Sequence, residues 1–213
     1  KNQNTDTMSQ GLVLASGTVT GGSAGAVTIV GDSRGVTSST SSYIRGAMIN
    51  GTVASAGGNV RVTGYGGAGA QYDYGVDMAG SVTAIGSGTV SISGTAGTGG
   101  SGGNVGVYTS GAGTISSVDG AIAITGTGAT GGGVLRDHGV LIGGSNAVRS
   151  TGIGSITVTG TAVNNDNGYT RGVSIEAGGL RTNSGNIKVD AAALLNYQVA
   201  AYVNAPITST SGN

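Results

Sequence analysis

Nine acidic side chains and a single histidine are the groups in this chain that could perform acid–base chemistry. Cleavage of a glycosidic bond needs two or three carboxylates within about 5–10 Å of one another. Asp73 and Asp77 are close in sequence, but the other carboxylates are scattered along the chain. Asp137 precedes His138, and neighbouring residues of a strand point to opposite faces, which is poor geometry for a catalytic dyad. We therefore predict no catalytic residues and interpret Asp137-His138 as a solvated turn.

Oxygen ligands for a cation gather in the Asn-Asn-Asp-Asn run at 164–167. The run lacks the periodic spacing of a dedicated calcium site, and no window fits the G-G-x-G-x-D nonapeptide of calcium-binding β-rolls. The chain has no cysteine for a thiolate metal site. Glycine-rich matches to phosphate loops arise by chance at this glycine content, and no helix is expected after them. The sequence therefore predicts neither a metal nor a cofactor.

The tyrosines show a more regular spacing. Tyr43, Tyr72 and Tyr169 each lie three residues before a glycine that opens a short apolar run, and Met8 occupies the same place. One interpretation is an aromatic platform for sugar or for a neighbouring fibre. The other is a ladder that pins a glycine-rich stretch to the body of the protein, and the packing interpretation is favoured.

The elements that position these residues follow from an unusual composition. The chain has 46 glycines, one proline and neither phenylalanine nor tryptophan, and charged residues make up 8%. Val, Ile and Thr recur throughout and the net charge is zero, which favours order over disorder. Without a Lys/Arg cluster we expect no nucleic-acid partner. No apolar run reaches the roughly 18 residues of a transmembrane helix.

Internal repeats give the fold. Each of six units opens on a glycine that precedes an apolar run, and the openings are 35, 29, 31, 33 and 33 residues apart. The opening glycines are Gly11, Gly46, Gly75, Gly106, Gly139 and Gly172. Seven to nine residues later comes one aliphatic residue: Val19, Val53, Val82, Ile115, Val148 or Leu180. An alternating pair follows: Val27/Ile29, Val60/Val62, Val90/Ile92, Ile122/Ile124, Ile156/Val158 or Ile187/Val189.

Three short strands per unit, separated by Gly, Asn or Ser, describe one coil of a solenoid. Stacked coils would align equivalent residues in ladders about 4.8 Å apart, with Thr109 a polar intruder among aliphatic side chains. The predicted fold class is all-β, a right-handed parallel β-helix of about six coils of 29–35 residues. We expect residues 1–213 to form a single segment of it.

The two ends of the sequence fall in mid-repeat. Residues 207–213 match residues 180–186 step for step, so they read as part of a seventh unit. No charged edge strand or capping helix is expected at either end. We therefore expect either a piece of a longer array or a subunit that stacks end to end with copies of itself.

The stretches GVLIGGSNAVRSTGIGSITVTGTA at 139–162 and GVSIEAGGLRTNSGNIKVDA at 172–191 resemble the repeats of filamentous-haemagglutinin-like and autotransporter-type bacterial surface proteins. The resemblance extends over the chain from Gly11 onward. It implies long right-handed β-helices that are secreted to the cell surface and serve as adhesins or fibre shafts. It implies no site residues.

The leading hypothesis is thus a secreted, non-enzymatic fibre or adhesin shaft that grows by strand pairing at its ends. A carbohydrate-binding or carbohydrate-cleaving β-helix, with cell-surface glycans as partners, is the alternative. Ice binding is a weaker one, because only Thr157/Thr159 gives the full Thr-x-Thr pair. Arg61, Lys188 and Asp190 interrupt that array.

Overall fold

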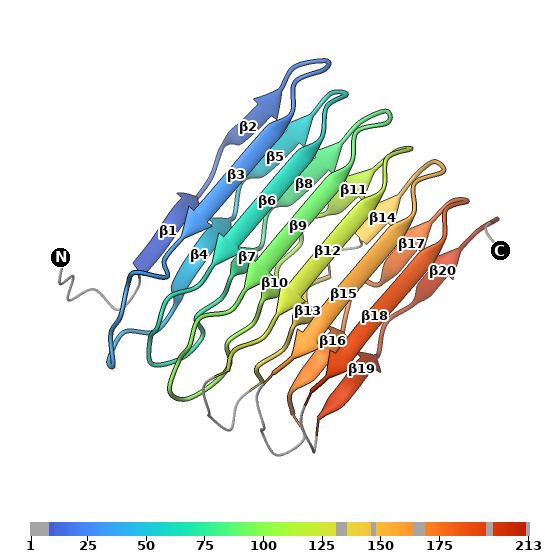
Figure 1. The fold of residues 1–213 in the computed structure, drawn as a ribbon. Helices are drawn as coiled ribbons and strands as arrows, with labels where there is room; N and C mark the ends of the chain where they lie inside the picture. Colours follow the sequence, from blue (N-terminus) through green and yellow to red (C-terminus); the bar gives the residue numbers. More distant parts are fainter. Residues whose placement is uncertain (1–8, 131–135, 146–147, 164–168, 195–197, 212–213) are drawn as a thin grey trace.

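A computed structural model describes residues 9–130, 136–145, 148–163, 169–194 and 198–211. Within these ranges the chain forms strands and no helices, and no segment qualifies as a membrane-spanning helix. The strands stack in parallel, coil upon coil, along one axis (Figure 1). The predicted parallel β-solenoid of about six coils is therefore confirmed.

Each of six coils contributes one strand to each of three sheets, which we name A, B and C, and β19 and β20 add a seventh strand to sheets A and B. Sheet A consists of β1 (Ser9–Leu14), β4 (Ile44–Ile49), β7 (Val76–Met78), β10 (Val107–Thr109), β13 (Val140–Ile142), β16 (Arg171–Ile175) and β19 (Val199–Val203). Sheet B consists of β2 (Thr18–Gly21), β5 (Thr52–Ser55), β8 (Ser81–Ala84), β11 (Ile115–Ser117), β14 (Val148–Ser150), β17 (Leu180–Thr182) and β20 (Ile207–Ser209). Sheet C consists of β3 (Val27–Asp32), β6 (Val60–Tyr65), β9 (Val90–Thr95), β12 (Ile122–Thr127), β15 (Ile156–Ala162) and β18 (Ile187–Ala193).

The residues predicted to stack in columns are the ones that pair between neighbouring strands. Residues one position after the opening glycine pair from coil to coil in sheet A, and the single aliphatic residues do the same in sheet B. The alternating pairs align in sheet C. Ile207 pairs with Leu180, as the repeat alignment predicts for a seventh unit.

The core is a tube of stacked aliphatic side chains. Nearly all of the predicted inward residues of the middle coils are fully buried in one continuous cluster. Thr109 lies in this column, is fully buried, and its hydroxyl has no hydrogen-bond partner among the described atoms. The column therefore tolerates one unsatisfied hydroxyl, a feature that usually costs about 1–3 kcal/mol.

The opening glycines have a steric cause that the sequence did not reveal. A Cβ on Gly106 would lie 2.5 Å from the backbone nitrogen of Thr127, where a sheet C strand passes the start of a sheet A strand. A Cβ on Gly126 would overlap the carbonyl of Gly139 in the same crossing. Glycine is required here because two backbones approach more closely than a side chain allows.

The connections from sheet C to sheet A are the longest in each of the six complete coils, and their described residues lie together along one side of the solenoid (Figure 1). The turns from sheet B to sheet C are shorter and lie at the opposite side. The described parts of these glycine-rich connections form a row of stacked loops beside sheet A. This row and the outer face of sheet A hold most of the large polar and aromatic side chains.

Candidate functional site

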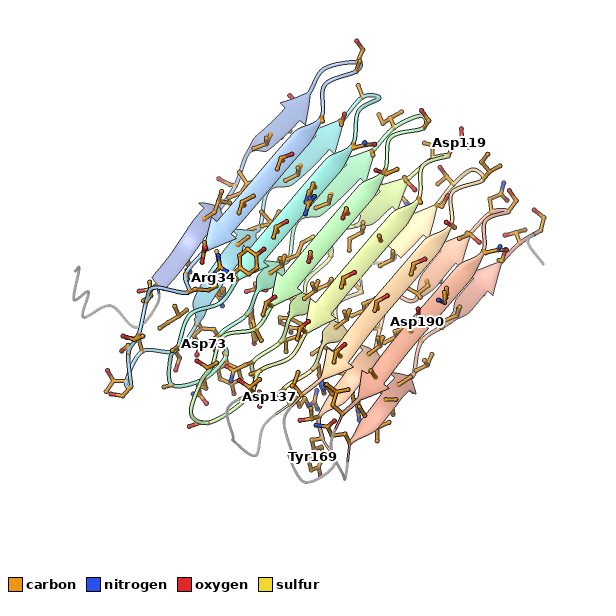
Figure 2. The ribbon with its side chains drawn as sticks, viewed as in Figure 1. Arg34, Asp73, Asp119, Asp137, Tyr169 and Asp190 are labelled. Carbon is orange, nitrogen blue, oxygen red and sulfur yellow. The ribbon has the colours of Figure 1, made fainter. Side chains whose placement is uncertain are left out.

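The carboxylates occupy separate parts of the molecule. Asp73 and Asp137 lie in the row of long loops, Asp119 lies at the opposite turns, and Asp190 lies on sheet C (Figure 2). Among the described residues, no group of three or more His, Cys, Asp and Glu side chains could hold a metal ion. The Asn-Asn-Asp-Asn run at 164–167 lies outside the described residues.

A buried column of Asp and Asn side chains joins successive loops. Asp73, Asn104 and Asp137 each stand two residues before an opening glycine and are fully buried. The Asp137 Oδ1 accepts the Asn104 N–H at 2.7 Å, and the Asn104 Oδ1 accepts the Asp73 N–H at 2.8 Å. Each side chain therefore binds the backbone of the coil before it, which fixes the start of the sheet A strands.

Asp73 ends this column and makes two bonds, one to the preceding coil and one within its own loop. Its two carboxylate oxygens accept the N–H groups of Ile44 and Gly69, both at 2.8 Å. Burial raises the pKa of the Asp73 carboxyl to about 6, against the opposing effect of these two hydrogen bonds. Asp73 and Asp137 stand at the same position of the repeat, so the expectation that the carboxylates other than Asp73 and Asp77 are scattered was wrong for Asp137.

The predicted solvated turn at Asp137-His138 was also wrong. Both residues are fully buried, and the His138 Nδ1 accepts the backbone N–H of Arg171 at 3.0 Å. Burial, with smaller contributions from Arg171 and Arg136, lowers the pKa of His138 to about 3. His138 is therefore a neutral imidazole that bonds to the following coil, while Asp137 bonds to the preceding one. Position in a loop was a poor guide to exposure because loops stack on one another here.

The tyrosine ladder exists over two coils. The rings of Tyr43 and Tyr72 stack with centroids 5.1 Å apart and planes 20° apart. Both residues have positive φ, 63° and 59°, and the next residue in their column is Gly103, with φ 76°. A Cβ on Gly103 would lie 2.6 Å from the Tyr72 ring, so the ring covers the glycine. Tyr169 lies apart, 61% exposed and without a contact to another described aromatic ring.

Two further tyrosines extend this cluster, and sequence reasoning missed them. Tyr74 meets the Tyr43 and Tyr72 rings edge-on, and its centroid lies 5.2 Å from that of Tyr108. Burial raises the pKa values of both Tyr74 and Tyr108. They stand one residue before and two residues after their opening glycines, so they occupy different columns and strict alternation would place them on opposite faces. No repeat signal in the sequence marks them as neighbours.

An ion pair lies beside the stacked rings. The Arg45 Nε lies 2.8 Å from the Asp77 Oδ2, and each side chain is 12% exposed. The guanidinium lies over the Tyr43 ring, 4.6 Å from its centroid. Burial raises the pKa of Asp77, and Arg45 opposes this shift. The charge of Asp77 is therefore held in place by one arginine that also packs on an aromatic ring.

A second charged group lies farther along the same face. The Arg171 Nη1 lies 3.1 Å from the Glu176 Oε1, and the Arg136 Nη1 lies 3.3 Å from the Glu176 Oε2. Two guanidiniums therefore share one carboxylate. Arg171 also lies 3.8 Å from the ring centroid of Tyr202. We call the outer surface of sheet A, from Tyr43 to Tyr202, the aromatic–arginine face.

Two hollows open on the aromatic–arginine face. The first, of about 270 Å³, is lined by Tyr72, Tyr74, Gly103, Val105, Tyr108, Arg136 and Leu141. The second, of about 180 Å³, is lined by Arg136, Arg171, Glu176, Tyr202 and Asn204. Arg136 lines both, so the hollows adjoin.

Comparison of the chain with protein-family models, with curated proteins and with solved structures finds no match. The resemblance to filamentous-haemagglutinin-like and autotransporter-type proteins therefore stays a prediction from the repeat pattern. Any function assigned to the aromatic–arginine face or to the ends of the solenoid must be argued from the geometry of the described residues.

Proposed function

We propose that the protein is a structural segment of a fibre or adhesin shaft, built from stacked β-solenoid coils and extended at its ends by further coils. The extending coils come from more repeats or from another copy of the chain. The proposal includes a location outside the cell or on a bacterial surface, which rests on the resemblance of the repeats. Catalysis is not part of it.

The supporting observation is the exposure of core columns at both ends. Val203 is 48% exposed, whereas Ile175, its partner in the preceding coil, is fully buried. Ile207 is 40% exposed and its partner Leu180 is fully buried. A further parallel coil would bury these side chains and would pair the free backbone groups of the edge strands.

The first coil has the same property. Val19 is 37% exposed, and its partner Val53 in the next coil is fully buried. The two ends of a parallel solenoid are complementary, because the edge strands of one end expose backbone N–H and C=O groups that can pair with those exposed at the other end. Head-to-tail contact between such ends gives an open filament rather than a closed ring when no rotation closes it.

Electron microscopy of the purified protein at high concentration tests the proposal. We expect unbranched fibres, and we expect Ile207→Lys to shorten or abolish them because a charge would enter the column at the end. Thr208→Lys is the matched control, since Thr208 is the exposed neighbour on the same strand and pairs with the exposed Arg181. Compact monomers of the unaltered protein, with no fibres, would contradict stacking between copies.

A further inference from the structure

The two adjoining hollows form a path along the stacking axis. Their lining residues come from the coils of β7, β10, β13, β16 and β19. Five neighbouring strands span about 19 Å at the strand spacing of parallel sheets. An extended oligomer of several units fits a path of this length better than a compact small molecule does.

The aromatic end of the path presents the partly exposed Tyr108 ring, packed at a tilt on the buried Tyr74. Tyr74 and Tyr108 are held at a ring-centroid distance of 5.2 Å, and Leu141 packs in the same cluster. Tyrosine rings combine an apolar face with a hydroxyl that can hydrogen-bond. Pyranose rings have the complementary character, since their C–H faces are apolar and their edges carry hydroxyl groups.

The backbone is strained at two neighbouring tyrosines of the same cluster. Tyr43 and Tyr72 adopt positive φ, a conformation that costs a bulky residue energy and that glycine adopts freely. Gly103 occupies the equivalent position in the next coil, so glycine is compatible with this site. The Tyr72 ring lies against Gly103 and forms part of the lining of the first hollow.

The polar end of the path carries an excess of positive charge. Among the described residues of the aromatic–arginine face, Arg45 pairs with Asp77, whereas Arg136 and Arg171 share Glu176. The Arg136 side chain is 56% exposed and stands where the two hollows meet. A guanidinium with donors left over binds a carboxylate or sulfate group, often through two parallel hydrogen bonds.

We propose that the aromatic–arginine face binds an acidic oligosaccharide that lies along the stacking axis. A sugar ring packs on the partly exposed Tyr108, which is backed by the buried Tyr74, and an acidic group contacts Arg136. The site binds and does not cleave: Asp77 and Glu176 lie in coils three strand spacings apart, about 14 Å along the axis, which exceeds the separation that glycoside hydrolysis needs. This inference does not rest on stacking between copies.

Isothermal titration calorimetry with the folded chain tests it. The probes are oligogalacturonate and heparin-derived hexasaccharides, with maltohexaose as the neutral comparator and hexaglutamate as a non-sugar anion. We expect saturable binding of at least one acidic saccharide, weaker binding of maltohexaose and no binding of hexaglutamate. Equal binding of maltohexaose would overturn the role of charge, and binding of hexaglutamate would overturn the assignment to saccharides. No binding of any saccharide would overturn the proposal as a whole.

Matched variants locate the site. We expect Arg136→Gln and Tyr108→Ala each to weaken binding of the acidic saccharide about tenfold, since each removes one of the contacts proposed. Arg149→Gln is the control, because Arg149 is an exposed arginine on β14 of sheet B, away from the face. Circular dichroism checks that each variant folds. An equal loss of affinity in Arg149→Gln, or no loss in Arg136→Gln, would show that the hollows are not the site.

Discussion

The outer faces of sheets A and C rest on the same kind of core and differ in how many of their side chains are large and in contact with one another. The register of sheet C aligns small hydroxyl residues, such as Ser93, Thr125 and Thr159, from coil to coil. The corresponding outer positions of sheet A carry tyrosine, arginine and carboxylate side chains that contact one another across coils. Stacking of the coils depends on the inward side chains, and both sheets contribute these to one continuous core.

This difference separates the residues that form any solenoid of this kind from the residues that give this protein its specific properties. A periodic outer face adds little beyond solubility and strand propensity, because its side chains stand in water. The outer face of sheet A departs from the repeat, and its departures are buried, paired or strained. We therefore place the specific properties of this protein on sheet A and the loops beside it, and four predictions test this division.

The largest expected effect compares two ion pairs, one on each face. Arg45→Gln leaves Asp77 buried without its cation and should lower the free energy of unfolding by about 3–5 kcal/mol. Lys188→Gln removes a similar contact of 2.7 Å on sheet C, but those side chains are 66% and 48% exposed. Its effect should be below about 0.5 kcal/mol. Urea unfolding of both variants makes the measurement, and equal losses would refute the division.

The buried Asp and Asn column gives the next largest effect. Asp73→Ala leaves the buried N–H groups of Ile44 and Gly69 without acceptors and should cost about 2–3 kcal/mol. Asp119→Ala is the control at the opposite turns, where the exposed Asp119 accepts the Ile153 N–H at 3.2 Å. We expect thermal unfolding to shift clearly for Asp73→Ala and little for Asp119→Ala. A larger shift for Asp119→Ala would refute the role of the column.

The pH dependence of stability should report His138. Its pKa is about 3 in the folded chain and ordinarily 6.5, so only the unfolded chain gains a proton as the pH falls below 6.5. The contribution of His138 to stability should therefore decrease as the pH falls from 6.5 toward 3, by about 2 kcal/mol at pH 5. His138→Asn keeps an acceptor for the Arg171 N–H and cannot titrate, so it should lose less stability between pH 7.5 and pH 5.

Asp73 acts in the opposite direction, since its pKa is raised to about 6. Protonation of the folded state between pH 6 and pH 4 makes stability rise as the pH falls. The unaltered protein and the His138→Asn variant both carry Asp73. Subtracting one stability–pH profile from the other therefore removes the contribution of Asp73. Identical profiles for the unaltered protein and His138→Asn would show that His138 is not the titrating group.

The smallest expected effect concerns the positive-φ column. Gly103→Ala places a methyl group against the Tyr72 ring at a φ of 76°, and should cost about 1–2 kcal/mol. Gly35→Ala is a control, because a Cβ there meets no atom within 4 Å and its φ is not in the positive region. Chemical unfolding compares the two. A neutral Gly103→Ala would mean that the Tyr72 ring moves freely and does not define the hollow.

Sequence reasoning predicted the core columns, the register and Thr109 because these follow from a local pattern. Inward side chains alternate along each strand, and equivalent residues of successive repeats must stack. It recovered only part of the site. Tyr43 and Tyr72 share a column and were found, whereas Tyr74 and Tyr108 lie in different columns and meet only on the folded surface. Tyr169 shares the column and lies apart.

The sequence by itself determined the solenoid, since the repeat of apolar positions every 29–35 residues allows one stacked arrangement of strands. The tertiary structure alone decided which polar side chains are buried and which of them meet. His138 and Asp73 are buried because loops from neighbouring coils cover them, and no local pattern encodes the path of a glycine-rich loop. The contacts between non-equivalent columns, from Arg45 with Asp77 to Arg136 with Glu176, depend on that path.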